Sequence, residues 1–532
     1  MRPVKLKNNL LSFINDERLM LFFSLAAIII VNGQVLFTFF FSDDFLHFYQ
    51  ISNWHPLEFI FSSIGGHLYI FRNLVFYCMF KLFGLNSVAY FSIVLLTHLG
   101  CAFILYKIIH LLTGKATLAA AGMMIWGITP ANYSALSWYS AYGHLLVGFF
   151  FLLFLYDLLR IEKGTILFSR HIAIRWSIYL LLMATSYGIG LTIACLSPVA
   201  IVIILWRHDE KWKIAASTFP AITIILLLFI FKDAIYYYFS GIISNSSAAL
   251  LKVPLLVALS NYKIILELFI TQCTLNIYFL TPFPFFLVLV TMLCPKCLNL
   301  FFTTIPVVIA IPAVILFVVL FSRSHRYRRH YAGLSIFFLG LMGLLAYIHG
   351  ADYKINNLVG ILLVFDTRFY YVTLMIAVII LTLMADELLD VFSKYLNKIV
   401  PCLFIILAIS IYPSLNLAKE MDFGNGSGSE YDRKIYHDTI ADIEKTIRSR
   451  PEGSSVVIDN TMNEKISLYP TLQSGFPGKA AIFAITYPHN TFEGRRVYFV
   501  ERDCHVVDQN TKKKHWRMSS LIISACDRNK SN

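Results

Sequence analysis

Two adjacent carboxylates, Asp43 and Asp44, follow the first long apolar run of the sequence. Carboxylates beside hydrocarbon are costly, so those that occur there are candidates for a functional role. A desolvated aspartate can act as a general base, and an aspartate pair can hold a divalent cation such as Mg²⁺ or Mn²⁺ through oxygen ligands. The alternative is that the pair only marks the solvated boundary at which the run ends.

A second stretch with chemical potential places Arg368 among aromatic residues, where a late apolar run begins. A guanidinium group stays charged and donates paired hydrogen bonds to phosphate. We therefore predict that Arg368 binds a phosphate group, with help from Arg72 or Lys354. The alternative is an arginine that anchors the chain at the membrane interface, within a belt of aromatic side chains.

Other polar and aromatic side chains near these two stretches can stack on sugar rings or form hydrogen bonds with hydroxyl and phosphate groups. The candidates for substrate binding are His47, His67, Tyr139, His144, His349, Asp352 and Tyr370. For the aromatic members, anchoring at the membrane interface explains the same pattern equally well.

The elements that must position these residues are membrane spans. Of the 532 residues, 58% are hydrophobic and 14% charged, which excludes a soluble enzyme. The net charge is +13, of which +11 lies before residue 419 among apolar runs. Short basic loops that orient spans account for that excess, so we expect no nucleic-acid partner.

Apolar runs of roughly 20 residues, the length that crosses a bilayer, recur along the first 418 residues. Clear candidates are 19–41, 88–112, 143–160, 190–206, 214–231, 262–281, 302–322, 332–349, 369–386 and 399–417, and shorter ones are 67–83, 116–131, 174–188 and 283–299. We predict an all-α polytopic membrane protein with about eleven to thirteen spans, in which 67–83 is either re-entrant or interfacial.

The basic loops predict the orientation of the chain. Basic residues before the first span place the N-terminus in the cytoplasm. The segments 42–87, 132–142, 232–261, 350–368 and the C-terminal tail then share the outer side. Since long loops on a rigid scaffold often carry function, we expect the functional face to be extracytoplasmic.

We divide the chain into a membrane domain (1–418), a flexible linker (419–430) and a small soluble α/β domain (431–532). Helical spacing marks 431–450, and strands are expected at 454–459, 480–486 and 496–501. Cys504 and Cys526 either form a disulfide in an oxidising compartment or remain two buried thiols.

Several common motifs are missing or incomplete. Cys294 and Cys297 have CxxC spacing but supply only two ligands, with no second Cys/His pair nearby in the sequence. The sequence contains no Walker loop, GxGxxG, HExxH or serine nucleophile elbow, so no nucleotide-driven chemistry is indicated.

The order of features over residues 15–160 resembles the N-terminal half of the GT-C superfamily of glycosyltransferases. Protein O-mannosyltransferases and aminoarabinose transferases belong to this superfamily, whose members use polyprenyl-phosphate-linked sugars. In them an acidic pair near the end of the first span, here Asp43 and Asp44, precedes interfacial helices. The segments Trp54–Pro56 and Gly65–Asn73 fit that order. Members often carry an acidic residue near 185–188, where this chain has none.

The resemblance implies an inverting transfer of a sugar from a polyprenyl-phosphate donor to a glycan, lipid or protein acceptor, outside the bacterial inner membrane. Asp43 or Asp44 would deprotonate the acceptor while Arg368 holds the donor phosphate, so the two stretches must border one pocket. The alternatives are a transporter or flippase of a lipid-linked or polar solute, a glycan polymerase or ligase, and a non-catalytic assembly protein on the same scaffold.

Overall fold

The computed structural model describes residues 17–40, 43–62, 67–240, 262–280, 298–352, 367–391, 428–460, 478–487, 491–501 and 522–524. In the membrane domain, the longer helices are α2 (Glu17–Asn32), α6 (Ser87–Thr113), α7 (Ala116–Ile128), α9 (Tyr142–Glu162), α10 (Arg170–Ala184), α11 (Gly188–Ile204), α13 (Phe219–Ser240), α16 (Tyr262–Phe279), α18 (Leu298–Arg323), α19 (Arg328–Asp352) and α21 (Tyr371–Val391). The shorter ones are η1 (Gly33–Phe37), α3 (Asp43–Asn53), α4 (Pro56–Ile60), α5 (Ile70–Phe83), η2 (Pro130–Asn132), α8 (Tyr133–Leu136), η3 (Tyr139–Ala141), α12 (Lys211–Ala216) and η5 (Thr367–Tyr370).

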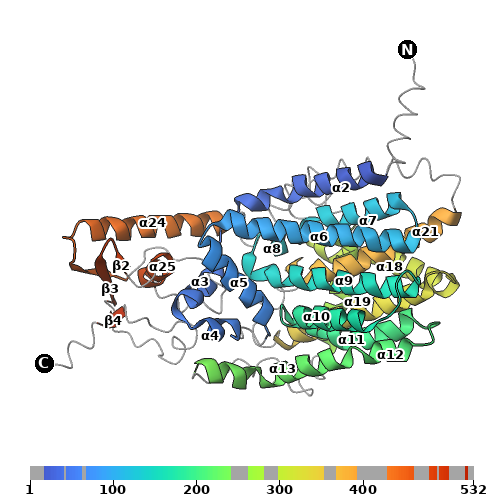
Figure 1. The fold of residues 1–532 in the computed structure, drawn as a ribbon. Helices are drawn as coiled ribbons and strands as arrows, with labels where there is room; N and C mark the ends of the chain where they lie inside the picture. The colour runs from blue at the N-terminus through green and yellow to red at the C-terminus, as the bar shows by residue number, and fades with distance from the viewer. Residues whose placement is uncertain are drawn as a thin grey trace, which may run out of the picture.

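The long helices run side by side as one bundle, with α3, α4 and α5 at one end (Figure 1). In the described ranges, six helical segments are long and apolar enough to cross a bilayer: Glu17–Phe37, Ser87–Thr113, Tyr139–Glu162, Lys211–Phe239, Arg328–Tyr347 and Arg368–Asp390. Large apolar side chains such as Phe22 and Leu96 are more than 60% exposed. That exposure suits a lipid-facing surface and confirms the prediction of a polytopic helical membrane protein.

The predicted total of eleven to thirteen spans remains a prediction, because 283–297 and 399–417 lie outside the described residues. The segment 67–83 forms α5, which is shorter than the six candidate spans and packs against α4 and α6. This geometry fits the interfacial alternative for that segment.

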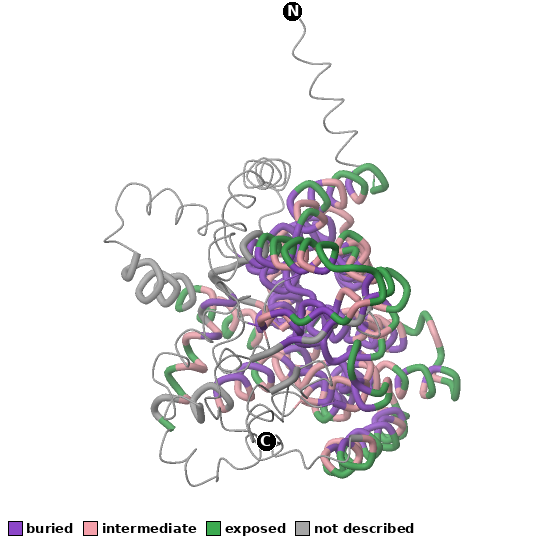
Figure 2. The backbone as a smooth tube through the Cα atoms, turned by 90° about the vertical axis from the view of Figure 1, so that its left-hand side faces the viewer, coloured by how far each residue is buried: buried purple, intermediate pink, exposed green. Residues whose placement is uncertain are grey.

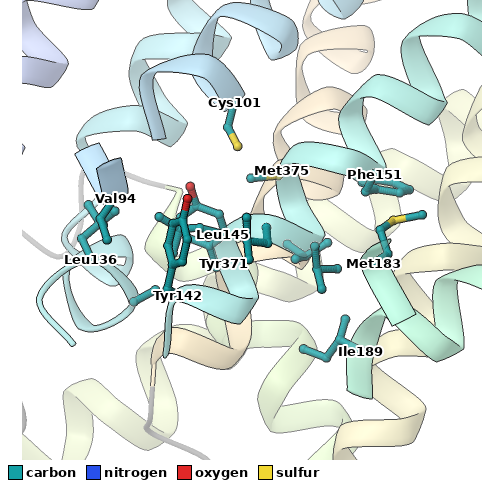
Figure 3. Packing of buried hydrophobic residues seen from close by; sticks show 14 of the residues in the cluster. Val94, Cys101, Leu136, Tyr142, Leu145, Phe151, Met183, Ile189, Tyr371 and Met375 are labelled. Carbon is teal, nitrogen blue, oxygen red and sulfur yellow. The ribbon is translucent and has the colours of Figure 1, made fainter. Parts of the chain in front are cut away.

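The core of the bundle lies where α6, α9, α11 and α21 meet. Tyr371 and Met375 of α21 lie close to Cys101 of α6 and Tyr142 of α9 (Figure 3). Gly148 of α9 allows this approach, because a Cβ atom there would lie 2.7 Å from Cε of Met375. Buried residues fill the interior of the bundle and exposed ones line its rim (Figure 2).

The two ends of α21 carry charged groups. Arg368 and Asp390 bound a span of 23 residues, and at 1.5 Å per residue this measures about 35 Å, enough to cross the roughly 30 Å core of a bilayer. At the Asp390 end, Lys115 and Arg326 both form ion pairs with Asp386 and Asp390, at 2.6–3.3 Å. These pairs join the α6–α7 and α18–α19 connections to the end of α21.

The C-terminal domain extends from the bundle end that carries α3 and α5 (Figure 1). It comprises α24 (Gly428–Arg448), β1 (Ser455–Asp459), α25 (Lys479–Thr486), β2 (Thr491–Phe492), β3 (Arg495–Glu501) and β4 (Ile522–Ser524). The central β3 pairs in parallel with β1, from Ser455 opposite Arg496 to Asp459 opposite Val500, in parallel with β4, and antiparallel with β2. The predicted small α/β domain is confirmed.

Three local predictions are corrected. Residues 480–486 form the helix α25 and not a strand; a short, uniformly apolar run is compatible with either when it is buried. The helix α24 begins at Gly428, inside the predicted linker 419–430, of which 419–427 are not described. The predicted outer segment 232–261 begins inside α13, which continues to Ser240.

Candidate active site at one end of the bundle

Asp44 is anchored by a turn between α8 and α9. It lies in the first turn of α3 and is fully buried, and its Oδ1 accepts hydrogen bonds from the Ser140 backbone N–H at 2.7 Å and from Ser140 Oγ at 2.5 Å. Asp43 precedes it and is only half-buried. The two carboxylates therefore differ: Asp44 is held by donors on a neighbouring element, whereas Asp43 is the more accessible member.

Arg72 lies on α5 opposite the start of α3 and is 2% exposed. Its guanidinium donates to Asn73 Oδ1 at 2.7 Å and to the Ser140 carbonyl oxygen at 3.2 Å, and it is 3.1 Å from His47 Nε2. Asn73 in turn donates to the Phe59 carbonyl oxygen on α4. These contacts fix the Arg72 side chain between α3, α4 and the turn that holds Asp44.

The pKa of Arg72 is lowered, first by burial, while the nearby Tyr69, Asp43 and Asp44 oppose the shift. Tyr69 lies under the guanidinium, with Arg72 Cζ 4.0 Å from the ring centroid. Burial raises the pKa of Tyr69 to about 12; the charges of Arg72 and Arg368 oppose this rise and that of Asp43 adds to it. The Tyr69 phenol therefore lies in the electrostatic field of Asp43 and of both arginines.

Arg368 enters the same region from η5, the short helix before α21. Its Cζ lies 4.2 Å from the ring centroid of Trp138 and 5.1 Å from that of Phe369. These cation–π contacts hold a half-buried guanidinium in place. η5 itself packs against η2 and α8, the elements that precede the Ser140 turn.

A row of neighbouring aromatic rings, which we call the ring row, connects the Arg368 side of the site to the Arg72 side. Tyr187, in the turn between α10 and α11, lies 4.7 Å from the His67 ring and 3.9 Å from the His144 ring, and His144 lies 5.5 Å from Phe369. Gly188 makes room for His67, because a Cβ atom there would lie 2.4 Å from His67 Nδ1.

The sequence-based analysis did not select Lys232, which belongs to the same site. This residue lies on α13 and is 4% exposed, with Nζ 4.7 Å from the ring centroid of Phe229. The pKa of His67 is lowered to about 4, first by burial and then by the positive charges of Lys232, Arg72 and Arg368. A signal was available: an ionisable residue inside an apolar helix is itself a functional candidate.

Thus the structure brings together Asp43, Asp44, Arg72, Lys232 and Arg368, with His67 and Tyr69 between them. We call this set the charged cluster. Of the other predicted residues, His47 contacts the Arg72 guanidinium, and His144 lies in the ring row. Two more pack inside the protein: Tyr139 against Phe76, Tyr90 and Tyr142, and Tyr370 at 1% exposure. Substrate binding by Tyr139 and Tyr370 stays a prediction.

Several residues singled out from the sequence fall outside the described part of the chain. Lys354 is not described, nor are the side chains of His349 and Asp352 at the end of α19. Cys504, Cys526 and the CxxC pair at 294–297 are not described either. The disulfide between Cys504 and Cys526 therefore stays a prediction. Within the residues that the structure does describe, no three His, Cys, Asp or Glu side chains are arranged to hold a metal ion.

Fold and site together define a polytopic helical membrane protein with a charged cluster at one end of its bundle, beside a small α/β domain. No protein-family model and no curated protein matches the chain. Among solved structures, the chain is similar to the crystal structure of ArnT from Cupriavidus metallidurans bound to undecaprenyl phosphate, with a TM-score of 0.43 and 12% sequence identity, over 95% of this chain and 89% of that one. At this TM-score, the likeness carries no conclusion about the site.

Proposed function

We propose that this protein is an integral-membrane glycosyltransferase that moves a sugar from a polyprenyl-phosphate donor to an acceptor on the outer side of the membrane. The observation that carries the proposal is the convergence of Arg72, Lys232 and Arg368 on His67, beside Asp43 and Asp44. Three cations, of which Arg72 and Lys232 are buried, suit an anion, and their position at one end of an apolar bundle suits an anionic group on a lipid.

In this mechanism the three cations bind the donor phosphate and stabilise the charge that develops on it as the sugar departs. Electrostatic stabilisation of this kind is commonly the largest contribution to catalysis. The bond between the anomeric carbon and the phosphate oxygen breaks, and the acceptor oxygen forms the new bond on the opposite face of the sugar. The phosphate keeps the electron pair of the broken bond.

Asp43 is the better placed general base, because it is the more accessible carboxylate and Ser140 already holds Asp44. It takes the proton of the acceptor hydroxyl as that oxygen attacks. Asp44 then has a supporting role, because its hydrogen bonds from Ser140 hold the start of α3 beside the base. His67, whose pKa is about 4, is neutral at pH 7 and adds no positive charge.

Binding of polyprenyl phosphate to the full-length protein in nanodiscs tests the proposal, with native mass spectrometry as readout and the uncharged polyprenol as control lipid. We expect the wild type to prefer the phosphate, and Arg72→Ala, Lys232→Ala and Arg368→Ala each to lose about tenfold or more in affinity, the value of one charge-assisted contact. Lys81→Ala is the matched control, because Lys81 is exposed and lies on the same helix as Arg72, nine residues further along the chain. Equal binding of phosphate and alcohol by the wild type would rule out a phosphate site.

Transfer itself is tested with a radiolabelled polyprenyl-phosphate sugar in membrane vesicles, with label followed into lipid, glycan and protein fractions. Label in one of these fractions supports the transferase and identifies the acceptor class. Phosphate binding without any transfer, together with movement of intact donor across the membrane, would favour the transporter or flippase. A requirement for a diphosphate-linked oligosaccharide donor would favour the polymerase or ligase.

A further inference from the structure

The C-terminal domain contacts the helix that begins with the acidic pair. Its helix α25 packs against α3. Its helix α24 contributes Tyr436, whose ring centroid lies 5.7 Å from that of Phe45 and 6.0 Å from that of Phe39. Both Phe45 and Tyr436 are buried, at 0% and 4% exposure. The domain therefore covers one side of α3 with packed side chains.

Tyr436 is itself fixed inside the domain. Its hydroxyl group is 2.6 Å from Thr486 Oγ1 on α25, so the residue joins the two helices that face α3. Two more residues of the same helix lie near the Phe39 ring. Arg433 Cζ and the His437 ring centroid are each 5.7 Å from its centroid. The contact is thus an aromatic cluster held from both helices of the domain.

A second face of α3, adjacent to the one that the domain covers, carries the proposed site residues. Asp44 and His47 are three residues apart and share one face, which meets Ser140 and Arg72. Phe45 and Phe48 are also three residues apart and lie one position further around the helix. Since α3 has only 11 residues, the packing of one face sets the rotation at which the other face meets the charged cluster.

We propose that Tyr436 is a positioning residue, through which the C-terminal domain fixes the rotation of α3 and hence the placement of Asp43 and Asp44. The catalytic part of this inference rests on the proposed function. The domain is then a part of the active site, in addition to any role it has in receiving the acceptor. Loss of the Tyr436 ring removes the aromatic contact between the domain and Phe45, leaves Phe39 with His437 and Arg433 on the domain side, and allows α3 to rotate.

Hydrogen exchange of the full-length protein in nanodiscs tests the positioning role without any substrate. We expect Tyr436→Ala to speed amide exchange across Asp43–Asn53 by about tenfold, because that helix loses part of its packing. Tyr436→Phe keeps the ring and should restore protection. The matched control is Ile443→Ala, since Ile443 is fully buried on the same helix, seven residues from Tyr436. It should leave exchange of α3 unchanged.

Tyr436→Leu, which keeps apolar bulk, replaces Tyr436→Ala if that variant unfolds the domain, as judged by lost protection of Ser455–Asp459. Unchanged exchange across α3 in the ring-deleted variant overturns the inference. Equal acceleration in Ile443→Ala overturns it too, because general loosening of the domain would then explain the effect.

Kinetics supply the second readout. Tyr436→Ala should lower kcat of sugar transfer by about tenfold while the KM for the donor changes by less than about twofold, since misplacement of a base affects the reaction more than donor binding. A rise in donor KM with normal kcat contradicts positioning of the base. If the wild type transfers no sugar, the proposed function is wrong but the positioning role is not affected. The exchange experiment still decides whether the domain fixes α3.

Discussion

Asp43 and Asp44 are neighbours in sequence but have different surroundings. Asp44 is fully buried and accepts two hydrogen bonds from Ser140, whereas Asp43 is half-buried and close enough to Tyr69 and Arg72 to affect their pKa values. Donors that bind an ionised carboxylate stabilise the anion and make it a weaker base. At the scale of single residues, we propose from this difference in burial that Asp43 is the base and Asp44 the anchor.

We predict that Asp43→Asn lowers sugar transfer by about 10²–10⁴-fold, the usual contribution of a general base, with little change in thermal stability. Asp44→Asn should lower the free energy of unfolding by about 1–3 kcal/mol, because a charge-assisted hydrogen-bond pair is weakened, and should reduce transfer less. Initial rates and thermal unfolding of both variants in nanodiscs check this division. Full activity of Asp43→Asn at normal expression contradicts the role of base.

The pH dependence of stability follows from His67. Its pKa is about 4 in the folded protein and 6.5 in the reference state, so between these values the unfolded chain binds the extra proton. The contribution of His67 is therefore complete above pH 6.5 and is lost as the pH falls towards 4. We expect His67→Gln to reduce the fall of the unfolding midpoint between about pH 7 and pH 5. His171→Gln, at an exposed position on α10, should leave the fall unchanged.

At the scale of elements, the charged cluster depends on close contact between α9 and the turn after α10. A Cβ atom on Gly143 would lie 2.5 Å from the Ser186 carbonyl oxygen, so no larger residue fits without a shift of backbone. The ring centroid of the next residue, His144, lies 3.9 Å from that of Tyr187. In addition, the Phe71 N–H donates to the Thr185 carbonyl oxygen at 3.0 Å. This one turn thus holds α5 and α9 together beside the cluster.

We predict that Gly143→Ala destabilises the protein by about 1–3 kcal/mol through overpacking and also lowers affinity for polyprenyl phosphate, because His144 and Tyr187 must move. Gly343→Ala is the matched control: it lies in α19, where nothing is within 4 Å of the added methyl group. That change should be neutral or slightly stabilising. Thermal unfolding and lipid binding of both variants decide the matter; normal binding by Gly143→Ala contradicts the proposed role of the turn.

At the scale of the whole molecule, two charged layers are separated by the length of α21. The charged cluster and the C-terminal domain lie at its Arg368 end, and the ion pairs of Lys115 and Arg326 lie at its Asp390 end. The basic segment around Lys213 belongs to the second layer, because Arg329 contacts the Ile204 carbonyl oxygen at the end of α11. A bilayer fits between the layers, and we propose that the basic one is cytoplasmic.

This orientation is checked with single cysteines and a membrane-impermeant maleimide on vesicles of known sidedness. Both test positions are exposed: Glu452 in the C-terminal domain and Lys213 on α12. Glu452→Cys should react only from the outer side and Lys213→Cys only from the cytoplasmic side, each introduced into a parent in which all nine native cysteines are serine. Reaction of both positions from one side contradicts the arrangement.

The sequence alone determined the class of protein and most of the helices. Runs of apolar residues are a local property, and helix bounds such as those of α6 and α9 follow from them within a few residues. The same reasoning located the helix 431–450 and the strands 454–459 and 496–501 of the tail. It also selected Asp43, Asp44, Arg72 and Arg368, because charge beside hydrocarbon is costly wherever it occurs.

Only the tertiary structure decided which of these groups meet. Helix packing brings Arg368 to residues more than 290 positions earlier and adds Lys232, which had been assigned to a loop. It also buries Tyr139 in an aromatic core and turns 480–486 into a helix against α3. The physical reason is that hydropathy tells which segments leave water, whereas the facing of their side chains depends on contacts between distant helices.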